Sequence, residues 1–213
     1  MQYPALEVKI WGEFACFTRP EMKVERVSYP VMTPSAARGV LEAIFWKPEF
    51  SWQVSQIWVL KPIRHFSILR NEVSNKMAVS TAKGWAEKGG SYFADKDRAQ
   101  RHTLALRDVA YIIKADVVLK SHATDDAAKY RDQFRRRVNN GQCHHTPYLG
   151  CREFASSFGP PEPDDKPIDY SDDLGRMLFD MDYAEDTSGR GIPRFFHAQL
   201  EKGILKIPAK EES

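Results

Sequence analysis

Lys129 and Tyr130 stand side by side near the start of a segment with helical spacing. An ammonium group stabilises charge that develops on a phosphate, and a phenol can accept or donate a proton. Such groups could cleave RNA without a metal ion, because the ribose 2′-hydroxyl is itself the nucleophile. Spacing alone favours the structural alternative, in which Tyr130 packs above Phe134 at the edge of the core and Lys129 is a solvated helix residue.

Two other sets of residues could hold a metal ion. Cys143, His144, His145 and Cys151 lie in or beside one predicted loop, but their spacing matches no common zinc pattern. Asp180 and Asp182 are two residues apart on a predicted strand, so both would face one side, as a metal-dependent nuclease would require. Surface carboxylates at the edge of an acidic segment are the simpler interpretation, and we expect neither a metal site nor a cofactor.

Several enzyme classes lack their motifs in this chain. The sequence contains no GxxxxGK[ST] phosphate-binding loop, no GxGxxG, no GxSxG and no HExxH. These absences argue against P-loop NTPases, dinucleotide-binding enzymes, α/β-hydrolases and zinc proteases of the common type.

Charge is distributed unevenly although the formal net charge is only +2. Residues 159–190 carry ten acidic and three basic side chains, whereas the first 158 residues carry a net charge of +8. A basic body beside an acidic segment suits a polyanionic partner that binds one face, and ordinary charge scatter is the alternative.

Nine basic and four acidic side chains lie in the stretch from Arg64 to Arg107, and we call residues 71–100 within this stretch the basic arm. Its lysines and arginines are interleaved with Trp85, Tyr92 and Phe93, and its glycines and asparagines predict a long loop or flexible hairpin. Single-stranded nucleic acid needs this combination, because cations bind phosphates and rings stack on bases. A solvated loop with a few packing aromatics is the alternative.

Periodicity and end signals predict the remaining elements. Thr33 as N-cap and Pro34 at the first helical position begin a helix with one apolar stripe that ends at Lys47-Pro48. Asp125-Asp126 and Asn139-Asn140-Gly141 bound a second helix. The predicted strands are 5–17, 52–70 with a break at Pro62, 103–119, 176–184, and a hairpin over 194–208 that turns at Glu201-Lys202-Gly203.

This order of elements predicts an α+β fold. We expect a ferredoxin-like (RRM-like) domain over residues 1–158, followed by a small antiparallel β-sheet domain over 159–213. A fold of this type hosts many functions, so it identifies none. Three cysteines without an even framework, and no apolar run of membrane-spanning length, predict a cytoplasmic protein without a membrane partner.

The segment SYPVMTPSAARGVLEAIFWKP (28–48) resembles a known family. It is similar to the Cas-five proteins of CRISPR subtype I-C (Dvulg), within the RAMP superfamily. Weaker supporting matches follow in the same order: VKIWGEFACFTRP, ALRDVAYIIKADVVL, the helix with Lys129, PYLGCREF and LGRMLFDMDY. The resemblance covers nearly the whole chain.

The resemblance implies a metal-independent endoribonuclease that cuts precursor CRISPR RNA within each repeat. It also implies that the protein stays on the 5′ handle of the guide, as a subunit of the type I-C surveillance complex beside the backbone and large subunits. Some members of the family bind double-stranded DNA. A structural subunit that caps the guide RNA without cutting it is the alternative.

The family's catalytic residues transfer only in part. A relative has a catalytic tyrosine just before Trp-Lys-Pro, where this chain has Phe45, and a Lys-His pair early in the second helix, where it has Lys129 and Tyr130. Three alternatives remain open. Tyr130 replaces the histidine, although an unperturbed tyrosine has a pKa of about 10; or the missing group is His144, His145, His65 or Tyr29; or the protein does not cut.

Basic residues on the predicted helices and in the basic arm are the candidates for contacting RNA phosphates. They are Arg38, Lys47, Lys83, Lys88, Arg98, Arg101, Arg131, Arg135 and Arg136.

Overall fold

A computed structural model describes residues 3–75, 77–183 and 191–209. The strands are β1 (Leu6–Ala15), β2 (Arg26–Val27), β3 (Phe50–Val59), β4 (His65–Val73), β5 (Arg98–Leu119), β6 (Ser157–Gly159), β7 (Asp172–Tyr183), β8 (Gly191–Glu201) and β9 (Ile204–Lys206). The helices are α1 (Pro34–Ile44), α2 (Val79–Lys88) and α3 (Ala127–Asn139), with a 3₁₀ turn at Ala94–Asp97. No helix in the described ranges is long and apolar enough to cross a membrane.

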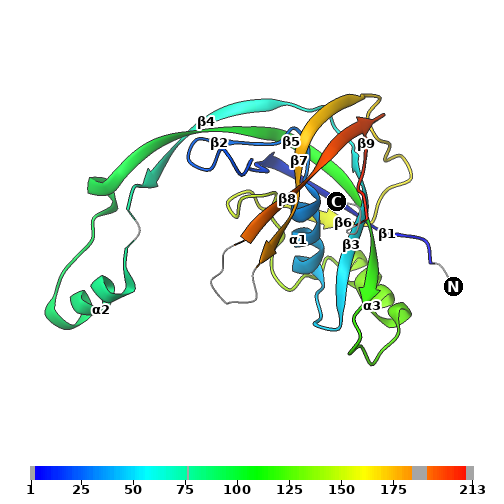
Figure 1. The fold of residues 1–213 in the computed structure, drawn as a ribbon, viewed down its shortest axis with the longest axis horizontal. Coiled ribbons are helices and arrows are strands. Elements are labelled where there is room, and N and C mark those ends of the chain that lie inside the picture. The colour runs from blue at the N-terminus through cyan, green and yellow to red at the C-terminus, as the bar shows by residue number, and fades with distance from the viewer. Residues whose placement is uncertain (1–2, 76, 184–190, 210–213) are drawn as a thin grey trace.

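The described strands join one mostly antiparallel sheet in the order β6-β1-β5-β3-β9-β8-β7, and β2 and β4 also pair with β5. β5 runs through the molecule as its longest strand, and Figure 1 shows the sheet curving along it. The α+β prediction is confirmed at this level. Alternation on β1 buries Leu6, Val8 and Ile10 against the helices.

Both predicted helices form, with the predicted caps. The Thr33 hydroxyl accepts a hydrogen bond from the Ala36 N–H at 3.3 Å, and Pro34 occupies the first turn. Asp126 caps α3 by accepting from the N–H groups of Ala128 and Lys129. The apolar stripe of α1 packs on β3, and α3 packs on β5 and β1, so the two helices cover one face of the sheet.

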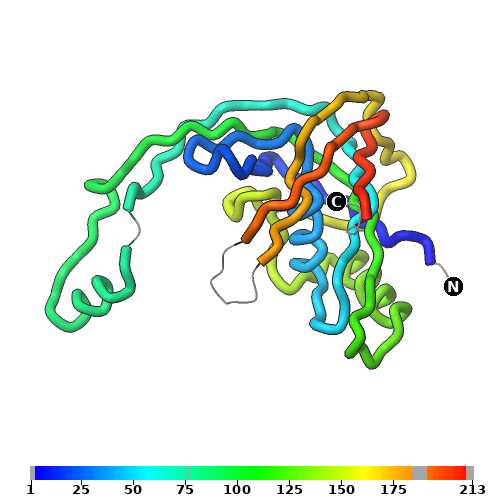
Figure 2. Tube along the Cα trace, in the orientation of Figure 1, coloured from blue at the N-terminus to red at the C-terminus, as the bar shows by residue number. Residues whose placement is uncertain are grey.

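The basic arm is more ordered than the sequence predicted. β4 and β5 form a ladder that continues to the pair Val73 and Arg98, and α2 lies beyond it at the far end of the projection in Figures 1 and 2. The hairpin alternative for 71–100 is therefore correct for the paired strands, whereas the loop alternative is wrong where α2 and the 3₁₀ turn form. α2 escaped prediction because it buries no side chain, contains Gly84 and begins without a side-chain cap.

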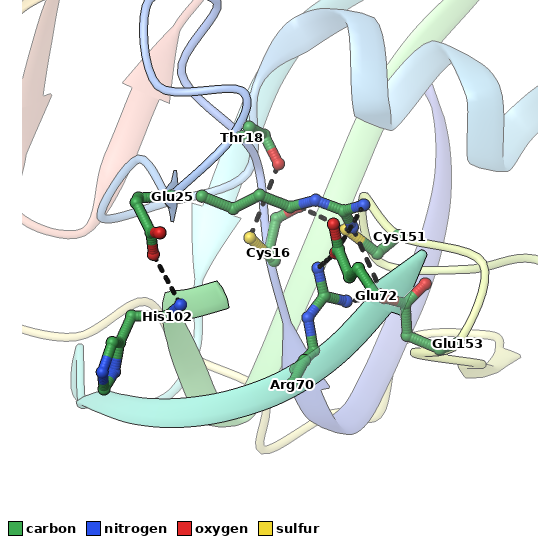
Figure 3. Close-up of polar contacts among 9 residues, drawn as sticks. Cys16, Thr18, Glu25, Arg70, Glu72, His102, Cys151 and Glu153 are labelled. Carbon is green, nitrogen blue, oxygen red and sulfur yellow. Dashed lines mark hydrogen bonds and ion pairs between the residues drawn. The ribbon is translucent and has the colours of Figure 1, made fainter. Parts of the chain in front are cut away.

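A cluster of opposite charges ties the start of this projection to the body (Figure 3). Arg26 on β2 and Arg70 on β4 contact the Glu72 carboxylate at 3.2 and 2.7 Å, and both also contact Glu153. The Arg26 guanidinium lies 3.4 Å from Cys151 Sγ. A hydrogen bond from the Cys16 thiol, helped by Arg26, holds the pKa of Cys151 below its ordinary value.

The last strands extend the same sheet. β9 pairs with β3 through Gln56 and Lys206. The turn between β8 and β9 lies at Lys202 and Gly203, as predicted, and both residues have positive φ. β7 begins at Asp172, four residues before the predicted start, and β6 was not predicted because its three residues are too few for a pattern. Residue 184, the last residue of the predicted strand 176–184, lies outside the described residues.

Candidate functional site

The end of α1 brings together most of the catalytic candidates. Phe45 is the C-cap residue, and its side chain is buried, with its ring centroid 5.5 Å from that of Phe50. The next residue, Trp46, is 54% exposed and begins the turn into β3. We call the surface around Trp46, Lys47 and Pro48 the α1 exit. Phe45 contributes packing beneath it and no ionisable group.

Lys129 lies in the first turn of α3, next to Tyr130, whose ring packs on Phe50 at the start of β3. Its ammonium group is exposed and lies 2.8 Å from the Asp125 carboxylate, one turn earlier. That hydrogen bond and the charge of Asp125 raise the pKa of Lys129 above its ordinary value. Lys129 therefore keeps its positive charge at the solvent-exposed surface, where it is paired with Asp125.

Tyr130 points the other way. Its side chain is 3% exposed, and its ring centroid lies 5.2 Å from that of Phe50. The hydroxyl is covered and has no hydrogen-bond partner among the described residues. Burial raises the pKa of Tyr130, and the carboxylates of Glu49 and Asp125 raise it further. A phenol in this position neither reaches a ligand nor loses its proton readily.

His144 and His145 lie in the loop after α3, which contacts the last turn of α1. Their backbone N–H groups donate to the Ala43 carbonyl at 2.8 and 3.3 Å, so their loop closes the last turn of α1. Both imidazoles are exposed. Arg137 joins them, because it donates to the Ile44 carbonyl at 2.8 Å and covers the Phe45 ring.

His122 is a residue that the sequence analysis missed. It lies in the short connection between β5 and α3, three residues before Asp125, and its Nε2 is 3.2 Å from the Pro48 carbonyl oxygen. A carbonyl oxygen only accepts, so in the neutral imidazole the proton lies on Nε2 and Nδ1 is the acceptor. The only signal in the sequence was a histidine just before a helix cap, which is too weak to single it out.

The structure places the other two acid–base candidates elsewhere. Tyr29 is fully buried, and its hydroxyl accepts a hydrogen bond from the Leu178 N–H at 3.2 Å. His65 is exposed at the start of β4, where it pairs with Leu106 of β5. Asp116, whose carboxylate binds Arg131 of α3, lies ten residues beyond Leu106 on β5. His65 is therefore about 33 Å along the strand from the point where α3 is bound.

The predicted RNA-binding residues fall into two groups. Arg131 is 3% exposed and binds Asp116 and the Pro4 carbonyl, and Arg38 is half-buried between Glu42 and Asp180. These two arginines hold elements together. The others have exposed or partly exposed side chains: Lys47, Lys83, Lys88, Arg98, Arg101, Arg135 and Arg136.

The residues weighed as metal ligands have other partners. Asp180 binds Arg38 at 2.7 Å, and Asp182 lies 3.4 Å from Arg194. Cys151 is buried beside Arg26, whereas Cys143 is exposed. The arrangement at the α1 exit can instead supply exposed imidazoles and cations to a polyanion.

Two curated relatives resemble this chain over nearly its full length, and a family model described as CRISPR-associated protein (Cas_Cas5) matches residues 5–208. A CRISPR pre-crRNA endoribonuclease Cas5d from Thermus thermophilus is 50% identical over 97% of this chain and 92% of its own length. A protein of the same name from Mannheimia succiniciproducens is 42% identical over 95% of this chain and 94% of its own length.

Solved structures share the fold at low sequence identity. A functionally uncharacterized protein from Streptococcus mutans has a TM-score of 0.69 at 19% identity, covering 100% of this chain and 97% of its own. A CRISPR-associated protein has the same TM-score at 21% identity, covering 100% and 96%.

Replacing Tyr130 by Phe tests whether the buried hydroxyl has any role. Since the hydroxyl has no partner, its removal should leave repeat-RNA cleavage unchanged and leave the urea midpoint of unfolding equal or higher. Cleavage assays and urea unfolding followed by circular dichroism measure the two quantities. A large loss of cleavage with unchanged stability would return Tyr130 to the catalytic set.

Proposed function

The chain belongs to the CRISPR-associated Cas5 family, and we propose that it cleaves precursor CRISPR RNA within each repeat without a metal ion. The observation that carries this proposal is its 50% identity, over 97% of its length, to a relative named as a pre-crRNA endoribonuclease. The exposed imidazoles and cations at the α1 exit support it, because they supply the groups that 2′-hydroxyl attack requires.

Lys129 and His122 are the residues that we assign to the scissile phosphate. The free Nδ1 of His122 takes the proton of the 2′-hydroxyl, which attacks the adjacent phosphorus and displaces the 5′-oxygen. The Lys129 ammonium stabilises the charge on the phosphate. A second proton donor then protonates the leaving oxygen, and His144 or His145 is the candidate. The products are a 2′,3′-cyclic phosphate and a 5′-hydroxyl.

Two adjacent residues of the α1 exit are assigned to the same RNA strand. Lys47, which is exposed and adjacent to Trp46, is assigned to a neighbouring phosphate of the strand. Trp46 is exposed and offers a stacking surface for a base.

A subunit that binds the 5′ handle without cutting it is the second candidate function. Two observations favour it: Phe45 replaces a phenol, and the Tyr130 hydroxyl is buried.

We further propose that the product stays bound in a type I-C surveillance complex, in contact with its backbone and large subunits, in the cytoplasm. Double-stranded DNA is a further proposed ligand.

The ferredoxin-like assignment belongs to this proposal. If β2, β4 and α2 are treated as additions, β1, α1, β3, β5, α3 and β6 follow the order strand, helix, strand, strand, helix, strand, and β6 ends one residue beyond 158. The corresponding sheet order β6-β1-β5-β3 is antiparallel throughout, which supports a split βαβ arrangement. We propose that residues 159–213 form the smaller β-rich unit added to it.

Cleavage of labelled repeat RNA in EDTA tests the proposed reaction. We expect cleavage to persist in EDTA and to be abolished by a single deoxyribose 5′ of the scissile bond. His122→Ala should lower the rate constant by about 100-fold or more. The matched control, His65→Ala, replaces an exposed histidine on β4 and should cut normally. Tight binding without cleavage would leave the scaffold function, and cleavage only with added Mg²⁺ would contradict the mechanism.

Replacing Lys129 by Ala separates catalysis from binding. Because its charge is assigned to the reacting phosphate, we expect the single-turnover rate to fall much more than RNA affinity, with partial recovery in Lys129→Arg. Rate and affinity measured on the same RNA make the comparison. Equal losses in both would mean that Lys129 is only a phosphate-binding residue.

The basic arm is proposed to bind the RNA backbone. Replacing Lys83, Lys88 and Arg98 by Ala should weaken binding and flatten the dependence of log K on log salt by about 2 for a single strand. A control with the same loss of charge replaces Lys61, Arg64 and Lys206, which pair with carboxylates on the body. If the two triple variants keep the wild-type slope, the arm does not touch the RNA.

A further inference from the structure

A groove lies beyond the N-terminal end of α1, between the loop after β1 and the β7–β8 hairpin. It has a volume of about 640 Å³. Its lining includes Arg19, Lys23, Tyr29, Arg176 and Phe195. A second hollow of about 430 Å³ continues it along β8 and shares Arg176 and Phe195. None of these groups takes part in the reaction proposed at the α1 exit.

Two arginines in the groove lie over aromatic rings. The Arg176 guanidinium carbon is 4.0 Å from the Phe195 ring centroid, and the Arg19 guanidinium carbon is 4.4 Å from the Tyr29 centroid. Arg176 and Phe195 are near neighbours on adjacent strands, because Arg176 pairs with His197 in the β7–β8 ladder. Each pair therefore presents a flat, cationic surface to the groove.

The groove also carries an excess of positive charge. Arg19, Lys23 and Arg176 line it, and Glu21 is the acidic residue in the same lining, 3.8 Å from Arg19. Among the described residues, no carboxylate lies within ion-pair distance of Lys23 or Arg176. Their charge is thus available to an anionic ligand.

The groove is connected to the α1 exit by β7 and α1. The Tyr29 hydroxyl accepts from the Leu178 N–H, and Asp180, two residues along β7, binds Arg38 in the second turn of α1. The eleven residues of α1 then span about 16 Å to the α1 exit. A single RNA strand of a few nucleotides could cover this separation.

We infer that this groove is a second RNA subsite, in which a nucleobase stacks on the Arg176–Phe195 pair and flanking phosphates contact Arg19 and Lys23. The inference rests on the proposed function, since it takes the same RNA strand as the ligand. Flat guanidinium–ring surfaces favour a base over an acidic peptide, because a peptide carboxylate would use the charge and leave the planar face unused.

Photo-crosslinking locates the contact directly. Full-length protein is irradiated with repeat RNA that carries 5-bromouridine in place of uridine, and the modified peptides are mapped by mass spectrometry. We expect crosslinks on the peptide that contains Phe195, and we expect Phe195→Leu, which keeps an apolar side chain and removes the ring, to lose them. Crosslinks confined to other peptides would overturn the subsite.

Fluorescence anisotropy measures its contribution to affinity. Arg176→Ala and Phe195→Leu should each weaken binding of the fluorescein-labelled repeat about fivefold to tenfold, while cleavage at saturating RNA continues. Arg107→Ala, an exposed arginine on β5 outside the groove, is the charge-matched control and should bind normally. Thermal unfolding checks that all variants are folded.

The outcomes distinguish the subsite from the enzyme. If wild-type protein binds and cuts RNA but both groove variants match Arg107→Ala, only the subsite fails. If wild-type protein does not bind repeat RNA, the proposed function fails and the subsite with it. If poly-glutamate binds wild-type protein more tightly than Arg176→Ala while the repeat RNA binds both equally well, an acidic peptide is the ligand and the RNA subsite is overturned.

Discussion

The hydrogen-bonded ladder of β5 is the constraint on which the rest of this structure depends. Its second half pairs with β1 and β3 and forms the surface that α3 covers, and its first half pairs with β2 and β4 to support the basic arm. A slip of one residue would bring the charged Lys114 into the position of the fully buried Ile113, so the core fixes the register. One strand therefore sets the separation between the arm and the α1 exit.

Close packing at the α1 exit decides which chemistry is available there. Phe45, Phe50, Trp52, Tyr130 and Phe134 form a continuous aromatic cluster with neighbouring ring centroids 4.7 to 5.5 Å apart. Inclusion in this cluster places the Tyr130 ring in the core and removes its hydroxyl from solvent. The proposed mechanism therefore assigns proton transfer to imidazoles on the surrounding loops, which hydrogen bonds to backbone carbonyls hold in place.

Positive charge is divided between structure and binding by burial. Arg131 and Arg38 each join two elements through carboxylates, and removing either would leave a carboxylate without its partner. Exposed cations remain on the arm, on the outer face of α3 and in the groove beside β7. The proposed path of the RNA follows these three exposed sets.

The sequence by itself was enough to predict α1 and α3, their caps, the turn at Lys202-Gly203 and the family. Each of these depends on residues that are close together in the chain. The sequence did not reveal α2, whose polar surface leaves no periodic signal, or His122, whose partner Pro48 is 74 residues away. The sequence also could not show that Arg131 is buried whereas Arg135 is exposed, or that the Tyr130 hydroxyl is covered. Only tertiary packing decided these points, because burial and ion pairing depend on which distant segments the sheet brings together.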